Sequence, residues 1–344
     1  MTESARREQA EASRPLPPGS RLPAHHLGVR VLLTGWFTFL HGEVTAGDVL
    51  ALEAVQRALD RAGIGYDAAW SPVFRPGSLR IEDAVPGRYT HLVFVCGPLH
   101  GEQVAGLHTR FASLRRIAVG VSVIDRDHPA CTGFDLVLAR DGDRGHPLRD
   151  LSAAVPEAVA PAVPVTGVVL AAGQGEYGGR RRHESVSDQL TSWLAGKTCA
   201  PVPLETRLDT RDWRLCSTAE AFQALLGRLD VVVTTRLHGL ALALRAGIPA
   251  LAVDPVDGGG KVTAQASAWQ WPAVLPADQA GDRDHLDTLW DWCLSRSGRR
   301  AAAAARAEGT QAEEARAEGD QAGAQAGRML TALLADLRRG LPVG

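Results

Sequence analysis

The fold is decided by the stretch Leu229–Asp254, which reads LDVVVTTRLHGLALALRAGIPALAVD. The run Val231–Val233 has the continuous apolar character of a buried parallel strand, and Pro249–Val253 has the same character. Between them lies a helical pattern that Thr234 or Thr235 can cap at its N-terminus. The sequence therefore predicts a strand-helix-strand unit of a parallel sheet covered by helices.

The first turn of this predicted helix contains Arg236, Leu237 and His238. Free backbone N–H groups and the positive end of the helix dipole lie there, beside the Arg236 guanidinium. A phosphate or carboxylate bound there would be stabilised by the N–H groups, the helix dipole and the guanidinium together. The alternative is structural: Arg236 pairs with a core carboxylate, and His238 is an interior histidine with its hydrogen bonds satisfied.

Composition indicates a soluble globular protein. The 344 residues suffice for two domains. The formal net charge of −2, without a basic cluster interleaved with aromatic residues, argues against a nucleic-acid partner. No stretch reaches the length of a transmembrane helix, and the first residues lack the apolar core of a signal peptide. The cysteines lack metal-site spacing, so no metal is expected and they are typical of reduced thiols in a cytoplasmic protein: Cys96, Cys131, Cys199, Cys216 and Cys293.

Apolar runs alternate with helical patterns in two successive sets, which predicts an α/β fold with two Rossmann-like parallel-sheet domains facing a cleft. A Pro- and Ala-rich stretch separates the sets. The predicted parts are a disordered leader at 1–27, an N-terminal domain at 28–150, a linker at 151–164, a C-terminal domain at 165–298, and a low-complexity tail at 299–344. In the tail, alanines favour helix but glycines weaken it, so we expect a frayed segment. The run Met329–Leu337 is expected to dock as a last helix.

Candidate site residues in the first half follow predicted strands, at the edge where open α/β sheets bind ligands. Gly47 and Asp48 lie between the first strand and its helix, where Asp48 is either a helix cap or a group facing the cleft. Gly97 and His100 follow the strand His91–Val95, and His100 alone is more often a surface group. Arg140 follows another strand and is either a site residue or half of a structural pair with the next aspartate.

Two further basic groups lie in the second half. The run Arg180–His183 is a candidate anion contact or a solvated loop. Lys261 follows the triple glycine Gly258–Gly260, which is typical of a closing phosphate-binding loop and equally of a plain surface loop.

Together these motifs resemble the polysaccharide pyruvyl transferase family. The resemblance is carried by TTRLHGLALALRAGIPALAVDP at 234–255 with a lysine after it, by the Gly47–Asp48 pair, by CGPLHGE at 96–102 and by LARD at 138–141. It spans roughly residues 29–275. The first loop lacks the asparagine usual before the Gly-Asp pair, and Cys96-Gly97-Pro98 replaces a family glycine run.

The resemblance implies a glycosyltransferase-B-like architecture and transfer of a pyruvyl group from phosphoenolpyruvate to a glycan, forming a ketal. It places the donor on Arg236, Leu237, Gly239 and Lys261, with His238 as the acid. Asp48 is the candidate for orienting or deprotonating the acceptor, with Gly47, Gly97, His100 and Arg140 as possible acceptor contacts. Phosphoenolpyruvate is a co-substrate, so no cofactor is expected.

Two other functions stay open from the sequence. One is a nucleotide-sugar glycosyltransferase, which has a similar architecture. Two Rossmann-like domains do not by themselves determine which donor is bound. A degenerate family member that only binds an anionic sugar or a partner is the third reading. The acceptor sugar and the oligomeric state are not set by the sequence.

Overall fold

The computed structural model describes residues 28–142, 145–155, 163–171, 173, 175–317 and 325–339. The chain divides into two compact units, Met1–Val159 and Ala160–Gly344, and the division falls inside the predicted linker. The predicted leader at 1–27 lies outside the described residues. In the part of the chain that is described, no helix is both long and apolar enough to cross a membrane.

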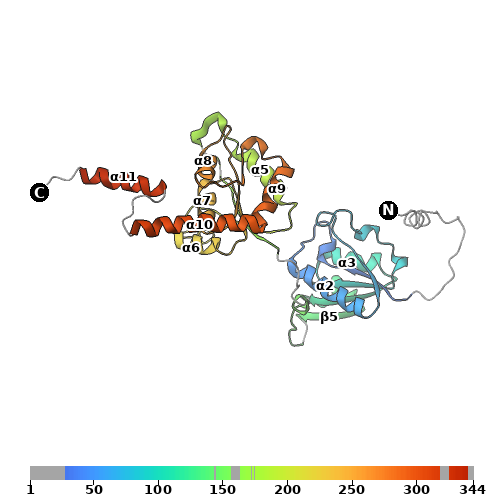
Figure 1. Cartoon of the computed structure of the whole chain (residues 1–344). Coiled ribbons are helices and arrows are strands. Elements are labelled where there is room, and N and C mark those ends of the chain that lie inside the picture. Colours follow the sequence, from blue (N-terminus) through green and yellow to red (C-terminus); the bar gives the residue numbers. More distant parts are fainter. Residues whose placement is uncertain are drawn as a thin grey trace. The chain divides into compact units, whose positions relative to one another are not determined.

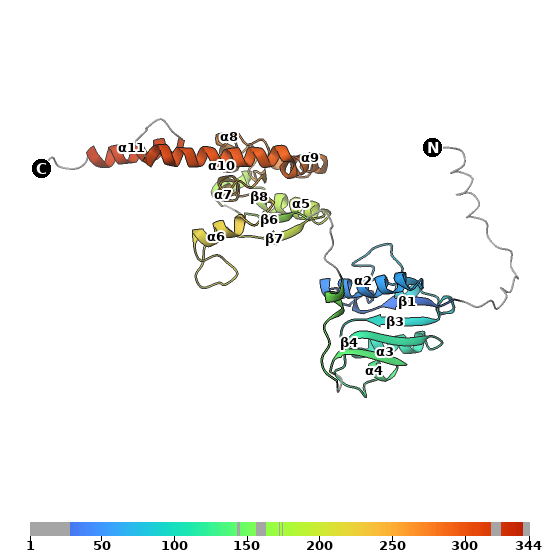
Figure 2. The ribbon, with the colours of Figure 1, turned by 60° about the horizontal axis from the view of Figure 1, so that its bottom comes forward.

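The N-terminal unit is built on a parallel sheet of order β2-β1-β3-β4-β5 (Figure 2). The side chains of its central strands are apolar on both faces of the sheet and form part of the two hydrophobic clusters of this unit. The strands are β1 (Arg30–Thr34), β2 (Gly65–Ala68), β3 (His91–Val95), β4 (Arg115–Ser122) and β5 (Leu136–Asp141). The helices are η1 (Trp36–Thr38), α2 (Ala46–Arg61), η2 (Ile81–Asp83), η3 (Pro86–Arg88), α3 (Gly101–Arg110), α4 (Pro129–Thr132) and η4 (Leu151–Ala154).

The C-terminal unit repeats this plan with a parallel sheet of order β10-β9-β8-β6-β7. The strands are β6 (Val165–Val169), β7 (Ala200–Pro203), β8 (Val231–Thr234), β9 (Ala250–Val253) and β10 (Val274–Leu275). The helices are η5 (Gly175–Arg180), α5 (His183–Leu194), α6 (Ala219–Leu226), α7 (Leu237–Arg245), α8 (Lys261–Ala268), η6 (Ala277–Gln279), α9 (Arg283–Leu294), α10 (Arg296–Ala317) and α11 (Gln325–Arg339). The prediction of two parallel-sheet domains is confirmed.

The C-terminal tail differs from its prediction. Instead of fraying from residue 301, the chain continues as α10 to Ala317, and Figure 1 shows α10 running beside α7. Ala302 and Ala305 are buried in the core, so tertiary packing supplements the helix propensity of alanine. The residues Met329–Leu337 lie within the helix α11, in which Leu333 and Leu334 are each 52% exposed, and the docking of this helix stays a prediction.

Strand order in each sheet determines where ligands can bind. In both units the first strand lies between the second and the third, so the chain reverses its direction across the sheet there. A crevice opens at such a topological switch point, outside the carboxyl ends of the two strands. The switch points lie between β1 and β3 in one unit and between β6 and β8 in the other.

Candidate functional site

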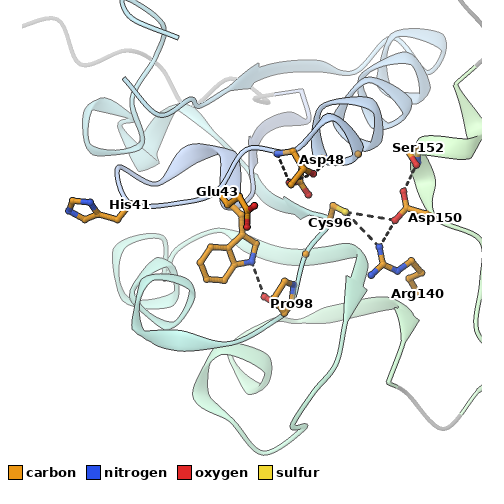
Figure 3. Close-up of a pocket in the computed structure, with 12 residues that line it drawn as sticks. His41, Glu43, Asp48, Cys96, Pro98, Arg140, Asp150 and Ser152 are labelled. Carbon is orange, nitrogen blue, oxygen red and sulfur yellow. Dashed lines mark hydrogen bonds and ion pairs between the residues drawn. The ribbon is translucent and has the colours of Figure 1, made fainter. Parts of the chain in front are cut away.

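A pocket of about 630 Å³ lies at the switch point of the N-terminal sheet (Figure 3). The loops after β1 and β3 form much of its wall, and the end of β5 and the segment before η4 complete it. Its lining residues are Trp36, His41, Glu43, Thr45, Gly47, Asp48, Cys96, Gly97, Pro98, Arg140, Asp150 and Ser152. The predicted residues Gly47, Asp48, Gly97 and Arg140 are therefore brought together here.

A tight turn at Cys96 and Gly97 shapes the pocket wall. Both residues have positive φ, 63° and 74°, which is unusual for a cysteine and typical of backbone strain at a functional site. Trp36 packs against this turn and donates its indole N–H to the Pro98 carbonyl at 3.0 Å. A Cβ at position 97 would lie 2.3 Å from the Trp36 ring, so glycine is required there.

Arg140 and Asp150 form the charged wall of the pocket. Arg140 pairs with Asp150 through Nη1, with Asp141 through Nε at 2.7 Å, and donates to Ser122 Oγ at 2.8 Å. These carboxylates raise the pKa of Arg140 further, and the hydrogen bond from Arg140 lowers the pKa of Asp141. The structural pair of Arg140 and Asp141 considered from the sequence is present. Arg140 also pairs with a second carboxylate, that of Asp150, ten residues along the chain. Since most of its donors are already used, Arg140 acts on a ligand mainly as part of this network.

Cys96 faces the same network. Its Sγ lies 3.9 Å from both Asp150 Oδ2 and Arg140 Nη1. Burial, followed by the nearby carboxylates, raises the pKa of the thiol to about 11. The thiol is therefore protonated at neutral pH and is a poor nucleophile.

Asp48 is the third residue of α2 and forms a reciprocal capping box with Thr45. Its Oδ2 accepts hydrogen bonds from the Thr45 N–H at 3.1 Å and from Thr45 Oγ1 at 2.7 Å. The capping alternative from the sequence is therefore present in the structure. Its predicted role toward an acceptor stays a prediction. Exposed Glu43 is a third carboxylate of this pocket, beside Asp48 and Asp150, and the sequence gave no signal to select it.

His100 is not among the residues that line this pocket. It is exposed at the N-cap of α3, and its ring stacks against His128 with 4.6 Å between centroids. This placement matches the surface alternative considered from the sequence.

In the C-terminal unit, α7 begins at the carboxyl end of β8. The predicted cap at Thr234 or Thr235 is wrong, because the N-cap of α7 is Arg236. Thr234 Oγ1 accepts the N–H of Arg236 at 2.9 Å, and both threonine hydroxyls also bond to the chain at the end of β6. Thr234 Oγ1 donates to the Val169 carbonyl at 2.9 Å, and Thr235 Oγ1 accepts from the Ala171 N–H at 2.7 Å. Arg236 is the N-cap and provides no side-chain cap, so the first N–H groups of α7 are left for another acceptor.

Arg236 reaches away from the helix toward the loop after β7. Its Nη1 pairs with Glu205 and donates to Thr206 Oγ1 at 2.9 Å, and the two charged side chains are 26% and 32% exposed. The alternative considered from the sequence was that Arg236 pairs with a core carboxylate. Such a pair is present with Glu205, but Glu205 is partly exposed and does not lie in the core. Sequence reasoning missed Glu205, since nothing local links it to a residue 31 positions away.

The neighbouring residues of this turn have distinct environments. Leu237 is half-buried and His238 is exposed, so His238 is not the interior histidine of the alternative reading. Gly239 is required by packing, because a Cβ there would lie 2.2 Å from Thr234 Oγ1. Gly239 therefore allows α7 to approach β8 closely, whether or not it touches a ligand.

Lys261 is the first residue of α8, after a loop that Asp254 organises. The buried Asp254 carboxylate accepts N–H groups from Val256, Gly260 and Thr263 at 3.1, 2.7 and 2.8 Å. The loop is thus held by charge-assisted hydrogen bonds and is not a plain glycine linker. Lys261 Nζ lies 3.6 Å from Glu176 Oε1.

No three His, Cys, Asp or Glu side chains within the described ranges form a group that could hold a metal ion. The predicted donor residues at 236–239 and Lys261 begin two helices, α7 and α8, that pack against each other at the same edge of the sheet.

One family model matches part of the C-terminal unit. Residues 204–257 match the model of the family described as polysaccharide pyruvyl transferase. This segment contains Glu205, the turn with Arg236 and His238, and Asp254. A search of curated proteins finds no match.

Similar solved structures include a rhamnosyltransferase, a heptosyltransferase and MurG. Spinosyn rhamnosyltransferase SpnG complexed with thymidine diphosphate is 14% identical, with 81% of this chain and 95% of that chain covered and a TM-score of 0.29. E. coli heptosyltransferase WaaC with ADP is 13% identical over 77% and 99%, with a TM-score of 0.24. Acinetobacter baumannii MurG is 12% identical over 90% and 99%, with a TM-score of 0.29. With scores this low, the fold assignment rests on the two sheets themselves.

The segment 204–257 of the C-terminal unit, which contains the turn at Arg236 and the loops around it, is thus similar to the polysaccharide pyruvyl transferase family of enzymes.

Proposed function

We propose that the chain transfers a pyruvyl group from phosphoenolpyruvate to two hydroxyls of a sugar in a cell-surface glycan or its precursor, forming a cyclic ketal. The observation that carries this proposal is the start of α7, where an uncapped helix N-terminus, Arg236 and exposed His238 occur together within the family segment. The proposal places the reaction in the cytoplasm, as expected from the cysteines.

Phosphoenolpyruvate carries a phosphate and a carboxylate, so its site needs cationic groups and N–H donors. The free N–H groups of α7 and the Arg236 guanidinium supply them, with Lys261 at the start of α8 as a second cation. Arg236 is already paired with Glu205, so an anionic donor has to compete with that carboxylate.

His238 is the proposed acid. An imidazole can donate a proton and take one up again in the same cycle. Protonation of the methylene carbon by His238 gives a methyl group and an oxocarbenium-like centre at C2. One sugar hydroxyl adds there, phosphate leaves, and the second hydroxyl closes the ketal. Of the two hydroxyl protons released, one returns to His238 and the other leaves with phosphate.

The N-terminal pocket is the proposed acceptor site. Its volume of about 630 Å³ and its polar wall suit a sugar, which presents several hydroxyls for hydrogen bonding. Asp48 is proposed to orient or deprotonate an acceptor hydroxyl, with Gly47, Gly97 and Arg140 as contacts. Because Asp48 also caps α2, exchange of Asp48 for asparagine, which keeps an acceptor oxygen, separates the two roles better than alanine.

The reaction is tested by following phosphate release from phosphoenolpyruvate with sugars that carry pairs of free hydroxyls. We expect His238→Ala to slow release by about 10²–10⁴-fold, the usual contribution of a general acid, while donor affinity changes little. His285→Gln, on an exposed histidine in the first turn of α9, is the matched control. An unchanged rate in His238→Ala contradicts the assignment of the acid.

A further inference from the structure

His183 is a buried histidine without a hydrogen-bond partner. It is 2% exposed, and neither ring nitrogen has a partner among the described residues. Buried polar groups in proteins are normally paired, and unpaired ones need an explanation such as a ligand. His183 begins α5 at the carboxyl end of β6, which is the switch point of the C-terminal sheet.

Charged side chains from three segments act electrostatically on this imidazole. Arg181 and Lys261 contribute positive charge, and Glu176 and Asp254 contribute negative charge. The Asp254 carboxylate already accepts three backbone N–H groups, and Glu176 is the ion-pair partner of Lys261. Neither carboxylate therefore provides the missing partner of His183.

The N-terminus of α5 is also open. Its N-cap, Arg182, provides no side-chain cap, and the first intrahelical bond runs from the Val186 N–H to the Arg182 carbonyl at 2.9 Å. The N–H groups of the three residues between them precede this bond and point toward the helix start. An anion with several oxygens would accept from these groups and from the imidazole together.

The segment η5 lies over this position, and the carbonyl of Arg180 at its end accepts the Asp257 N–H at 2.9 Å. None of its residues is buried, and Gly178 has the unusual backbone angles φ 52° and ψ −128°. The ring centroids of Tyr177 and His183 are 6.4 Å apart, and Lys261 Nζ lies over the Tyr177 ring at 5.8 Å from its centroid. Glu176 connects the segment to Lys261 at 3.6 Å, through side chains that are 59% and 38% exposed. An ion pair this exposed is easily exchanged for another anion.

We propose that His183, Lys261 and the N-terminus of α5 form a phosphate-binding site beneath η5, in which the phosphate takes the place of Glu176 beside Lys261 and gives His183 its missing partner. The phosphate group belongs to phosphoenolpyruvate before the reaction and to inorganic phosphate after it. Binding of phosphoenolpyruvate at this site rests on the proposed function, whereas binding of inorganic phosphate does not. His183 is a binding residue here, distinct from the acid His238.

Calorimetric titration of the full chain with phosphoenolpyruvate, inorganic phosphate and pyruvate tests the site. We expect phosphoenolpyruvate and phosphate to bind, and pyruvate, which lacks the phosphate, to bind at least about tenfold more weakly. His183→Leu should weaken both phosphate ligands by about tenfold, the usual cost of one hydrogen bond to a charged group. His285→Gln should leave both affinities unchanged.

Two further measurements separate binding from structure. Because leucine removes an unpaired buried polar group, the melting temperature of His183→Leu should equal or exceed that of the unaltered chain. Glu176→Gln, which removes the competing carboxylate, should strengthen phosphate binding, a result that a purely structural His183 does not predict. Unchanged phosphate affinity in His183→Leu, or weaker binding in Glu176→Gln, overturns the inference.

The outcomes also distinguish this site from the proposed function. Phosphoenolpyruvate binding that is lost in Arg236→Ala but unchanged in His183→Leu overturns the site and leaves the proposed function standing. Inorganic phosphate binding that depends on His183, without any binding of phosphoenolpyruvate, supports the site and contradicts the proposed function.

Discussion

Replacing Glu205 with glutamine should tighten the binding of phosphoenolpyruvate. Glu205 holds the Arg236 guanidinium, which is the proposed donor contact, so a bound donor has to displace it. Hydrogen bonds between charged groups contribute roughly 1.5–3 kcal/mol, but partly exposed ion pairs contribute only about 0.2–1 kcal/mol. At 26% and 32% exposure we take about 1 kcal/mol, which corresponds to an affinity about fivefold higher.

The assay is calorimetric titration of the Glu205→Gln chain with phosphoenolpyruvate. Glu308→Gln, which removes the same charge from an exposed position on α10, is the control for net charge and should leave the affinity unchanged. Unchanged or weaker donor binding in Glu205→Gln would refute the reasoning, because it would mean that the pair does not compete with the donor.

Three further predictions concern stability. Gly239→Ala places a Cβ 2.2 Å from Thr234 Oγ1, and urea unfolding should show a loss of about 2–3 kcal/mol. Asp254→Asn weakens three charge-assisted hydrogen bonds in a buried loop, so the same measurement should show a loss of about 3 kcal/mol. Burial, and then nearby Arg181, lowers the pKa of His183 from its usual 6.5, so the unfolded chain binds a proton that the folded chain does not. The unfolding free energy should therefore fall as the pH drops below 6.5 toward the lowered value, and His183→Leu should remove that part of the dependence.

The central strands were predictable from the sequence because their signal is local. The run before α7 and the strand His91–Val95 are continuously apolar, as strands buried on both faces must be. The strands that sequence reasoning did not identify, β2, β7 and β10, all lie at sheet edges, where the pattern weakens. β7 reads Ala-Pro-Val-Pro, and proline is tolerated there because an edge strand leaves some N–H groups unpaired.

The candidate site was predictable in position but not in its partners. Chain order places Arg236 and His238 at a strand end, and Gly97 and Arg140 at two others. The carboxylates that hold the arginines, Glu205 and Asp150, lie on separate loops, and only the folded sheet brings them into contact. The sequence marked His183 only as part of a basic run, and nothing local indicated that its side chain is buried.

The most direct test of the central claim is the thermal shift of the full chain with phosphoenolpyruvate against a uridine diphosphate sugar, on the unaltered protein and on Arg236→Ala. A ligand that binds the native state must raise its apparent stability, by about 2.7 kcal/mol at a hundredfold excess over Kd. The proposed function predicts a shift with phosphoenolpyruvate alone, which is lost in Arg236→Ala. A shift only with the nucleotide sugar would contradict pyruvyl transfer in favour of glycosyl transfer, and no shift with either would indicate a protein that has lost the donor site.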